Sequence, residues 1–185
     1  MLWRFVADGH GGGTWASEAK QAVTGGGTAY RGVFGAVTVG HDVGYSLGGY
    51  ANSWVDSRDN PAAQLDVSMS QAQPGLISFN HTTKNWRNES TVAFTPPWGT
   101  YVGGVAEFVP GFGAEGLIVP LGGYTPLLRP DTGESVGYLD FANISVYDVA
   151  TQRWLWQVAT GDVPTARKWM CSVGTSQNES QGHEM

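Results

Sequence analysis

The chain has 185 residues and a formal net charge of −6, because its 16 acidic residues outnumber its 10 basic ones. A nucleic-acid partner would require a basic face, so this charge balance argues against one. The sequence has no apolar run of about 20 residues that would span a membrane and no long apolar pattern with the 3.6-residue period of a helix. Short apolar stretches between Gly, Pro, Asn and Asp turns instead predict an all-β chain.

Two short strands are predicted near the N-terminus, at residues 2–6 and around Trp15. The three glycines at residues 11–13 are expected to form the turn between them. These residues do not have the basic leader and apolar stretch of a secretory signal peptide.

The next predicted strands form a longer unit. An apolar strand at residues 33–39 is followed by a second strand that ends at Gly48 and Gly49. Residues 51–75 are rich in Ser, Asp, Asn and Gln, so we expect a solvated loop there. The unit closes with an aromatic residue seven positions before a tryptophan, Phe79 and Trp86.

A second unit follows in the same order. Apolar residues 101–109 precede a strand that ends at Gly122 and Gly123, and a second insertion occupies residues 124–137. The unit again closes with an aromatic residue seven positions before a tryptophan, Tyr147 and Trp154.

The two units repeat with a nearly constant period. Gly122 follows Gly48 by 74 residues, and Trp154 follows Trp86 by 68, as Tyr147 follows Phe79. Self-similarity at a fixed spacing is the sequence signature of a repeat architecture.

This pattern resembles the kelch repeat, the four-stranded blade of a β-propeller. In that family the Gly-Gly pair ends the second strand, and the aromatic residue and the tryptophan belong to the third and fourth strands. The resemblance implies that the bulky rings pack between neighbouring blades, and it makes these eight residues the structural motif: Gly48, Gly49, Phe79, Trp86, Gly122, Gly123, Tyr147 and Trp154.

The resemblance divides the chain into four parts. Residues 1–30 would be the outer strands of a partial blade, residues 31–99 and 100–163 two blades, and residues 164–185 the start of another. Propellers usually close with four to eight blades, so we expect the chain to be a fragment of a larger propeller. In the last part, residues 164–174 predict an innermost strand.

The last part contains an arginine and a cysteine whose positions can be predicted. Arg167 stands before the expected innermost strand, at the place that Arg31 holds in the first unit and Thr100 in the second. Cys171, the single cysteine, is expected to be a buried small apolar residue in that strand.

The phrasing of the repeats is similar to secreted or membrane-anchored kelch proteins of filamentous fungi, often described as having a galactose-oxidase central domain. One hypothesis is a non-catalytic module that binds a protein or a carbohydrate, with no cofactor. The alternative is a copper-radical oxidase, which would need two tyrosines, a cysteine and two histidines at a copper ion. No such ligand set is evident at the four histidines, His10, His41, His81 and His183, since a metal site needs convergent donors.

Four Asn-x-Ser/Thr sequons favour an extracellular or lumenal location, with a cytoplasmic location as the alternative. They begin at Asn80, Asn88, Asn143 and Asn178. A sequon is a candidate glycosylation site on a surface loop if the chain enters the secretory route. A membrane anchor would have to lie outside this chain.

Overall fold

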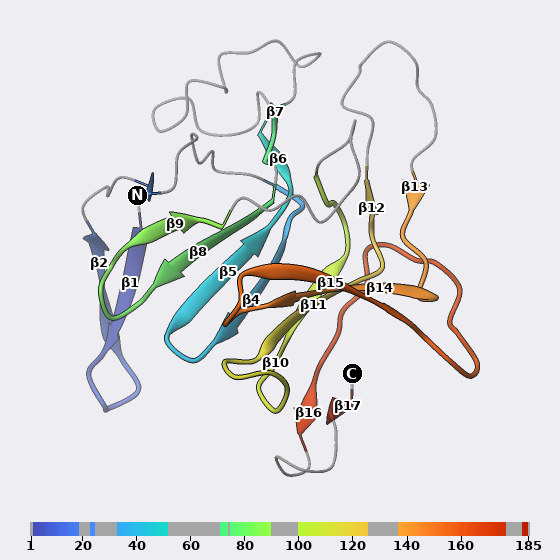
Figure 1. Cartoon of the computed structure of the whole chain (residues 1–185). Coiled ribbons are helices and arrows are strands. Elements are labelled where there is room, and N and C mark those ends of the chain that lie inside the picture. The colour runs from blue at the N-terminus through green and yellow to red at the C-terminus, as the bar shows by residue number, and fades with distance from the viewer. Residues whose placement is uncertain are drawn as a thin grey trace.

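The computed structural model describes residues 2–18, 23–24, 33–51, 71–73, 75–89, 100–125, 137–176 and 183–184. Within these ranges every regular element is a β-strand, as Figure 1 shows. No helix in them is long and apolar enough to cross a membrane. The prediction of an all-β chain is confirmed for these described residues.

The first large sheet contains a four-stranded antiparallel meander. Its strands are neighbours in chain order: β4 (Ala36–Gly40), β5 (Val43–Leu47), β8 (Leu76–Asn80) and β9 (Trp86–Asn88). A two-residue strand, β3 (Val23–Thr24), runs parallel to β9 and makes it a five-stranded sheet. Strand β4 begins three residues later than the apolar run predicts, because Val33 pairs separately with Tyr50.

The second large sheet is another antiparallel meander. It consists of β10 (Val105–Val109), β11 (Leu117–Leu121), β14 (Asn143–Asp148) and β15 (Arg153–Val158). Val102 pairs separately with Tyr124, as Val33 does with Tyr50 in the first unit. The two units therefore have the same strand order and the same additional bridge.

The last turn of each meander has the same side-chain chemistry. The Asn80 Oδ1 accepts the backbone N–H groups of Thr82 and Thr83, at 2.9 and 2.7 Å, and the Asp148 Oδ1 accepts two N–H groups in the same way. Side chains of Asn and Asp stabilise turns by such bonds. Each turn then needs one left-handed residue, at φ of 61° for Lys84 and 57° for Gln152.

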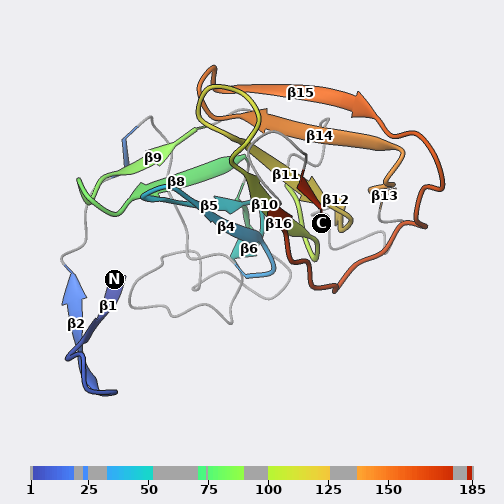
Figure 2. The same ribbon diagram turned by 90° about the horizontal axis from the view of Figure 1, so that it is seen from below.

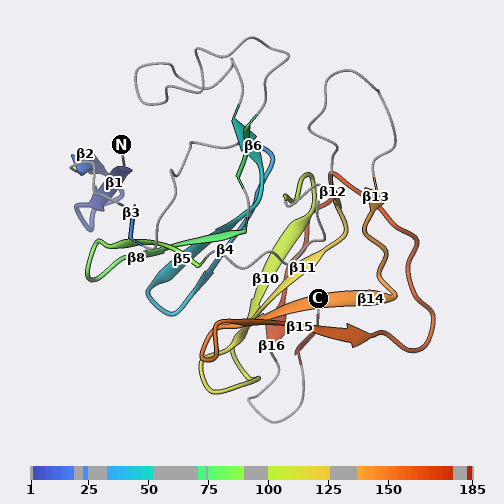
Figure 3. The same cartoon turned by 45° about the horizontal axis from the view of Figure 1, so that its top comes forward.

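Eight short strands pair outside the meanders. They are β1 (Leu2–Ala7) with β2 (Gly13–Glu18), β6 (Tyr50–Ala51) with β7 (Gln71–Ala72), β12 (Tyr124–Thr125) with β13 (Gly137–Tyr138), and β16 (Thr175–Ser176) with β17 (His183–Glu184). The hairpin β1–β2 stands apart from the meanders, beside the first one (Figure 3). The pairs β6–β7 and β12–β13 extend from the same end of the two meanders (Figure 1).

The glycine pairs directly follow β5 and β11, where the backbone comes close to other segments of the chain. Gly48 and Gly49 have φ of 67° and 89°, and Gly122 and Gly123 have φ of 59° and 76°. A Cβ atom would stand 2.7 Å from the Val33 oxygen at Gly49 and 2.7 Å from the Arg167 oxygen at Gly122. Glycine is therefore required for both the left-handed backbone and the close approach.

The inner strands β4 and β10 lie side by side, and the sheets spread apart from them toward β9 and β15 (Figure 2). The main core fills the space between the sheets, with Leu47 and Leu76 from the first sheet and Ile118 and Tyr147 from the second almost fully buried. Tyr101 is completely buried, and its hydroxyl is hydrogen-bonded to the carbonyl oxygens of Val105 and Leu121, at 3.0 and 2.7 Å.

Residues 164–174 do not form the predicted innermost strand. An inner strand takes its backbone hydrogen bonds from the next strand of its own meander. Among the described residues after 163, only Thr175–Ser176 pairs with another strand, His183–Glu184. The contact of this segment with β10 is instead made by a side chain, since the Ser172 hydroxyl donates a hydrogen bond to the Glu107 carboxylate. Cys171 is exposed, so the prediction that it is buried in a strand is wrong.

The predicted alignment of Arg167 with Thr100 is also wrong by one residue. The Gly49 N–H donates to the Tyr101 oxygen, and the Gly123 N–H donates to the Arg167 oxygen. Arg167 therefore corresponds to the buried Tyr101. The backbone contact with the glycine pair fixes the register, and the residue type at position 167 does not.

Candidate ligand-binding surface

Three backbone positions correspond to one another in successive parts of the chain. The Gly103 N–H donates to the Phe34 oxygen at 2.9 Å, and the Trp169 N–H donates to the Gly103 oxygen at 2.7 Å. All three residues have positive φ, 64° at Phe34, 69° at Gly103 and 56° at Trp169. This conformation is rare for a bulky side chain, so the surrounding structure holds two aromatic residues against their local preference.

Phe34 and Trp169 belong to a continuous row of five rings, which we call the aromatic array. In order along the row they are Tyr50, Phe34, Trp169, Tyr124 and Tyr138, and successive ring centroids lie 5.6, 5.1, 6.4 and 6.4 Å apart. Tyr50 and Tyr124 follow the two glycine pairs directly. The array therefore lies at the end of the meanders from which β6–β7 and β12–β13 extend.

The array is open to solvent. Phe34 is 41% exposed, Tyr138 50% and Trp169 55%. Gly103 leaves the space that the rings occupy, since a Cβ atom there would stand 3.3 Å from both Trp169 and Tyr124. Exposed aromatic residues at strained backbone positions are typical of binding sites.

A positive charge accompanies the rings. The Lys168 ammonium lies over Tyr124 and Tyr138, with its Nζ 5.1 and 5.5 Å from the ring centroids. This is the geometry of a cation–π contact. The neighbouring Arg167 lies over Phe141, 5.8 Å from its centroid. The chain has a net charge of −6, yet the charged groups found over these rings among the described residues are cations.

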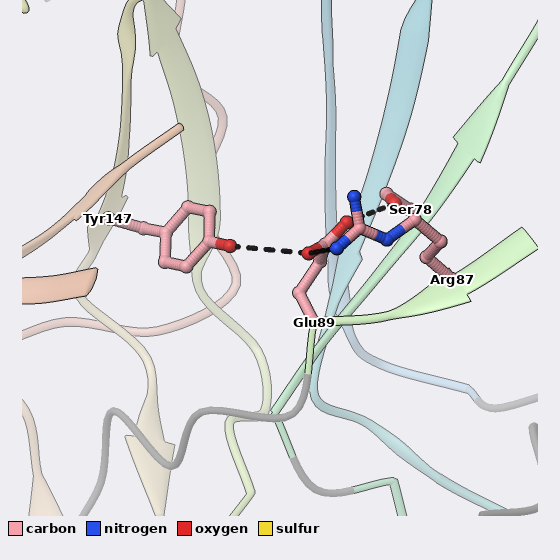
Figure 4. A network of polar contacts seen from close by, with 4 residues as sticks. All are labelled: Ser78, Arg87, Glu89 and Tyr147. Atoms are coloured by element: carbon pink, nitrogen blue, oxygen red, sulfur yellow. Dashed lines mark hydrogen bonds and ion pairs between the residues drawn. The ribbon is translucent and has the colours of Figure 1, made fainter. Parts of the chain in front are cut away.

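A second, polar site lies between the two meanders. A cavity of ≈ 270 Å³ is bordered there by residues of both sheets, among them Tyr45, Arg87, Glu89, Glu115 and Tyr147. Figure 4 shows its central contacts, which meet at Glu89.

Both oxygens of the Glu89 carboxylate are engaged. The Ser78 hydroxyl donates to Oε1 at 2.6 Å, the Arg87 guanidinium pairs with Oε2 at 3.4 Å, and the Tyr147 hydroxyl donates to Oε2 at 3.5 Å (Figure 4). The Glu89 side chain is only 8% exposed. Because Tyr147 comes from the second meander and the other partners from the first, Glu89 joins the two sheets.

The tyrosines beside this carboxylate are held in their neutral form. Burial, followed by the charge of Glu89, raises the pKa of both Tyr45 and Tyr147 above its ordinary value. A tyrosine that stays neutral donates a hydrogen bond to the carboxylate. The Tyr147–Glu89 contact therefore links the two sheets.

The motif residues named from the sequence lie in corresponding places in the two units. Phe79 pairs with Trp86 in the β8–β9 register and Tyr147 with Trp154 in the β14–β15 register. Their ring centroids lie 4.7 and 5.2 Å apart. None of these four residues belongs to the aromatic array, so they build the sheets that position it.

The sequons are dispersed. Asn80 uses its side-chain oxygen in the turn after β8 and borders the polar cavity, Asn88 lies in β9, and Asn143 is exposed at the start of β14. Asn178 lies outside the described residues.

The histidines are dispersed as well. His10 is exposed in the β1–β2 turn. His41 makes an edge-to-face contact with Phe108, and His81 makes one with Phe79, each with the ring centroids 5.2 Å apart. The described residues contain no group of three His, Cys, Asp or Glu side chains that could hold a metal ion.

The sequence interpretation missed the aromatic array, although one signal for it was present. The glycine pair is followed by a tyrosine in both units, at Tyr50 and Tyr124. A tyrosine at the same position in both units indicates that this position has the same surroundings in each. Phe34 and Trp169 carried no such signal, because glycine takes their place at Gly103 in the unit between them.

Comparison with known proteins agrees with the repeat. The chain is similar to a kelch repeat-containing protein of Arthroderma benhamiae, with 27% identity over 149 residues that cover 74% of this chain. The chain spans 20% of that relative's length. No protein-family model matches the chain.

Proposed function

We propose that the chain is part of a kelch-type β-propeller and acts as a non-catalytic binding module, with its protein or glycan ligand on the aromatic array. The observation that carries this proposal is the exposure of Phe34, Tyr138 and Trp169 in one row of rings. Large aromatic rings bury much apolar area at little cost in side-chain entropy, so they are frequent anchors of binding surfaces.

The propeller assignment is supported by the repetition of backbone contacts. Residues 31–99 and 100–163 would each be a blade, and residues 1–30 and 164–185 would belong to the blades beside them. Phe34, Gly103 and Trp169 make the same hydrogen bond from one part to the next, as expected when similar units are arranged around a common axis. The similarity to a kelch repeat-containing protein points to the same architecture.

The proposal extends to the protein's location. Asn143 is exposed, so a glycan attached there would project into solvent. We therefore propose glycosylation and an extracellular or lumenal location as well. Fractionation of a eukaryotic host that expresses the full-length protein, followed by mass spectrometry of its peptides, tests both, and unmodified protein in the cytosol would contradict them.

The binding function is tested with the whole chain and two tryptophan variants. Trp169→Ala removes a ring of the array, and Trp156→Ala removes a ring on β15 that is 62% exposed but lies outside the array. Glycan and peptide arrays should reveal a ligand that the parent chain and Trp156→Ala bind and that Trp169→Ala binds weakly. Recovered ligand should be chemically unchanged by mass spectrometry. A ligand that Trp169→Ala binds as well as the parent, or a ligand converted to product, would contradict the proposal.

A further inference from the structure

We infer that the aromatic array binds an acidic glycan, one whose pyranose rings carry carboxylate groups. This inference rests on the proposed binding function and names the ligand class of the same surface. Three properties of the array lead to it: the exposed ring faces, the angle between two of the rings, and the position of Lys168.

The exposed ring faces suit a sugar. One face of a pyranose presents C–H bonds of small positive partial charge, which are attracted to the negative face of an aromatic ring. Phe34 and Trp169 are each about half exposed, so both retain surface for such a contact. Such a contact needs no deep pocket and depends little on which sugar is bound, as base stacking on aromatic side chains depends little on which base is bound.

The angle between the rings forms a corner. The Phe34 and Trp169 planes meet at 71°, with the centroids 5.1 Å apart. A pyranose ring that stacks on one of them therefore also contacts the other. Such a corner orients a ring-shaped ligand, whereas coplanar rings would leave it free to rotate.

The position of Lys168 selects for an anion. Its ammonium already lies over two rings of the array, and these contacts do not remove its capacity to donate hydrogen bonds to a carboxylate. A cationic ligand would be repelled by this ammonium at short range. A carboxylated sugar satisfies the rings and the ammonium together, which a neutral sugar does only in part.

The experiment measures binding of a defined oligogalacturonate by isothermal titration calorimetry. The comparison ligands are a neutral galactose oligosaccharide of the same length and poly-glutamate of the same charge. The parent chain is expected to bind the oligogalacturonate most tightly. Trp169→Ala should weaken this binding about tenfold or more, as loss of one stacking contact does, Trp169→Phe should restore most of it, and Trp156→Ala should leave it unchanged.

The role of Lys168 has its own variant. Lys168→Met keeps the length of the side chain and removes the charge, so it should abolish the preference for oligogalacturonate over the neutral oligosaccharide and lower the salt dependence of binding. Circular dichroism and the melting temperature check that each variant is folded.

The outcomes separate this inference from the proposed function. Equal binding of the neutral oligosaccharide, or a ligand found only among peptides, overturns the acidic-glycan inference and leaves the binding function in place. Binding of poly-glutamate as tight as that of oligogalacturonate shows charge attraction alone and overturns it as well. Failure of every ligand to distinguish Trp169→Ala from the parent overturns both.

Discussion

Replacing Gly48 by alanine is expected to destabilise the chain far more than replacing Gly161 by alanine. Both glycines have positive φ, 67° and 91°, so each alanine incurs the left-handed penalty of about 1–2 kcal/mol. At Gly48 the new Cβ would also stand 2.5 Å from the Tyr101 nitrogen, whereas nothing lies within 4 Å at Gly161. Forcing an atom into packed backbone costs about a further 1–3 kcal/mol.

The Gly48→Ala variant should therefore lose about 2–5 kcal/mol of unfolding free energy, and Gly161→Ala about 1–2 kcal/mol. Urea titration followed by tryptophan fluorescence measures both losses, with the parent chain as reference. Because the two variants share the φ penalty, their difference isolates the close approach of the next unit. Equal losses would refute the argument that the glycine pair is required by contact with Tyr101.

Three further predictions concern stability and chemistry. The buried Thr100 hydroxyl lies within hydrogen-bond distance of two carbonyl oxygens, those of Gly49 and Gln73, at 2.8 and 3.0 Å. Thr100→Val removes the donor, so it should cost about 1–3 kcal/mol in the same titration. Burial raises the pKa of Tyr101 and Tyr147, so the unfolded chain loses these two protons at a lower pH than the folded chain does. The free energy of unfolding should therefore be unaffected by these groups below about pH 10 and should decline above it by up to about 1.4 kcal/mol per pH unit per tyrosine. Urea titrations between pH 8 and 11 measure this decline. Elemental analysis should find no stoichiometric copper, and a peroxidase-coupled assay should find no hydrogen peroxide when primary alcohols are supplied under oxygen. One copper per chain together with oxygen-dependent peroxide release would restore the oxidase hypothesis.

Much of the fold could be predicted from the sequence because the repeated residues interact with residues close to them in the chain. Asn80 and Asp148 each bond to their own turn, and Phe79 and Trp86 pair across one hairpin. Such interactions span few residues, so spacing alone predicts them. Residues 164–174 fail this test, since a strand there needs backbone partners that local sequence does not specify.

The aromatic array was not predictable to the same degree, because its members are far apart in the chain. Phe34 and Trp169 are 135 positions apart, and the backbone of Gly103 is hydrogen-bonded to both. Their positive φ runs against residue preference, so a local pattern would assign these positions to glycine. A sequence-based prediction fails at such positions because the tertiary structure overrides the local preference.

The same backbone contacts join the units and hold the rings. Gly103 accepts from Trp169 and donates to Phe34, so a ligand that touches both rings contacts residues fixed by successive parts of the chain. In the unfolded chain these rings are not brought together, and the ligand would have no corner to occupy. Binding only to the folded state raises its stability by RT ln(1 + [L]/Kd). An array ligand should therefore raise the unfolding midpoint of the whole chain, and the rise should disappear with the ring of Trp169 even though the sheets remain intact.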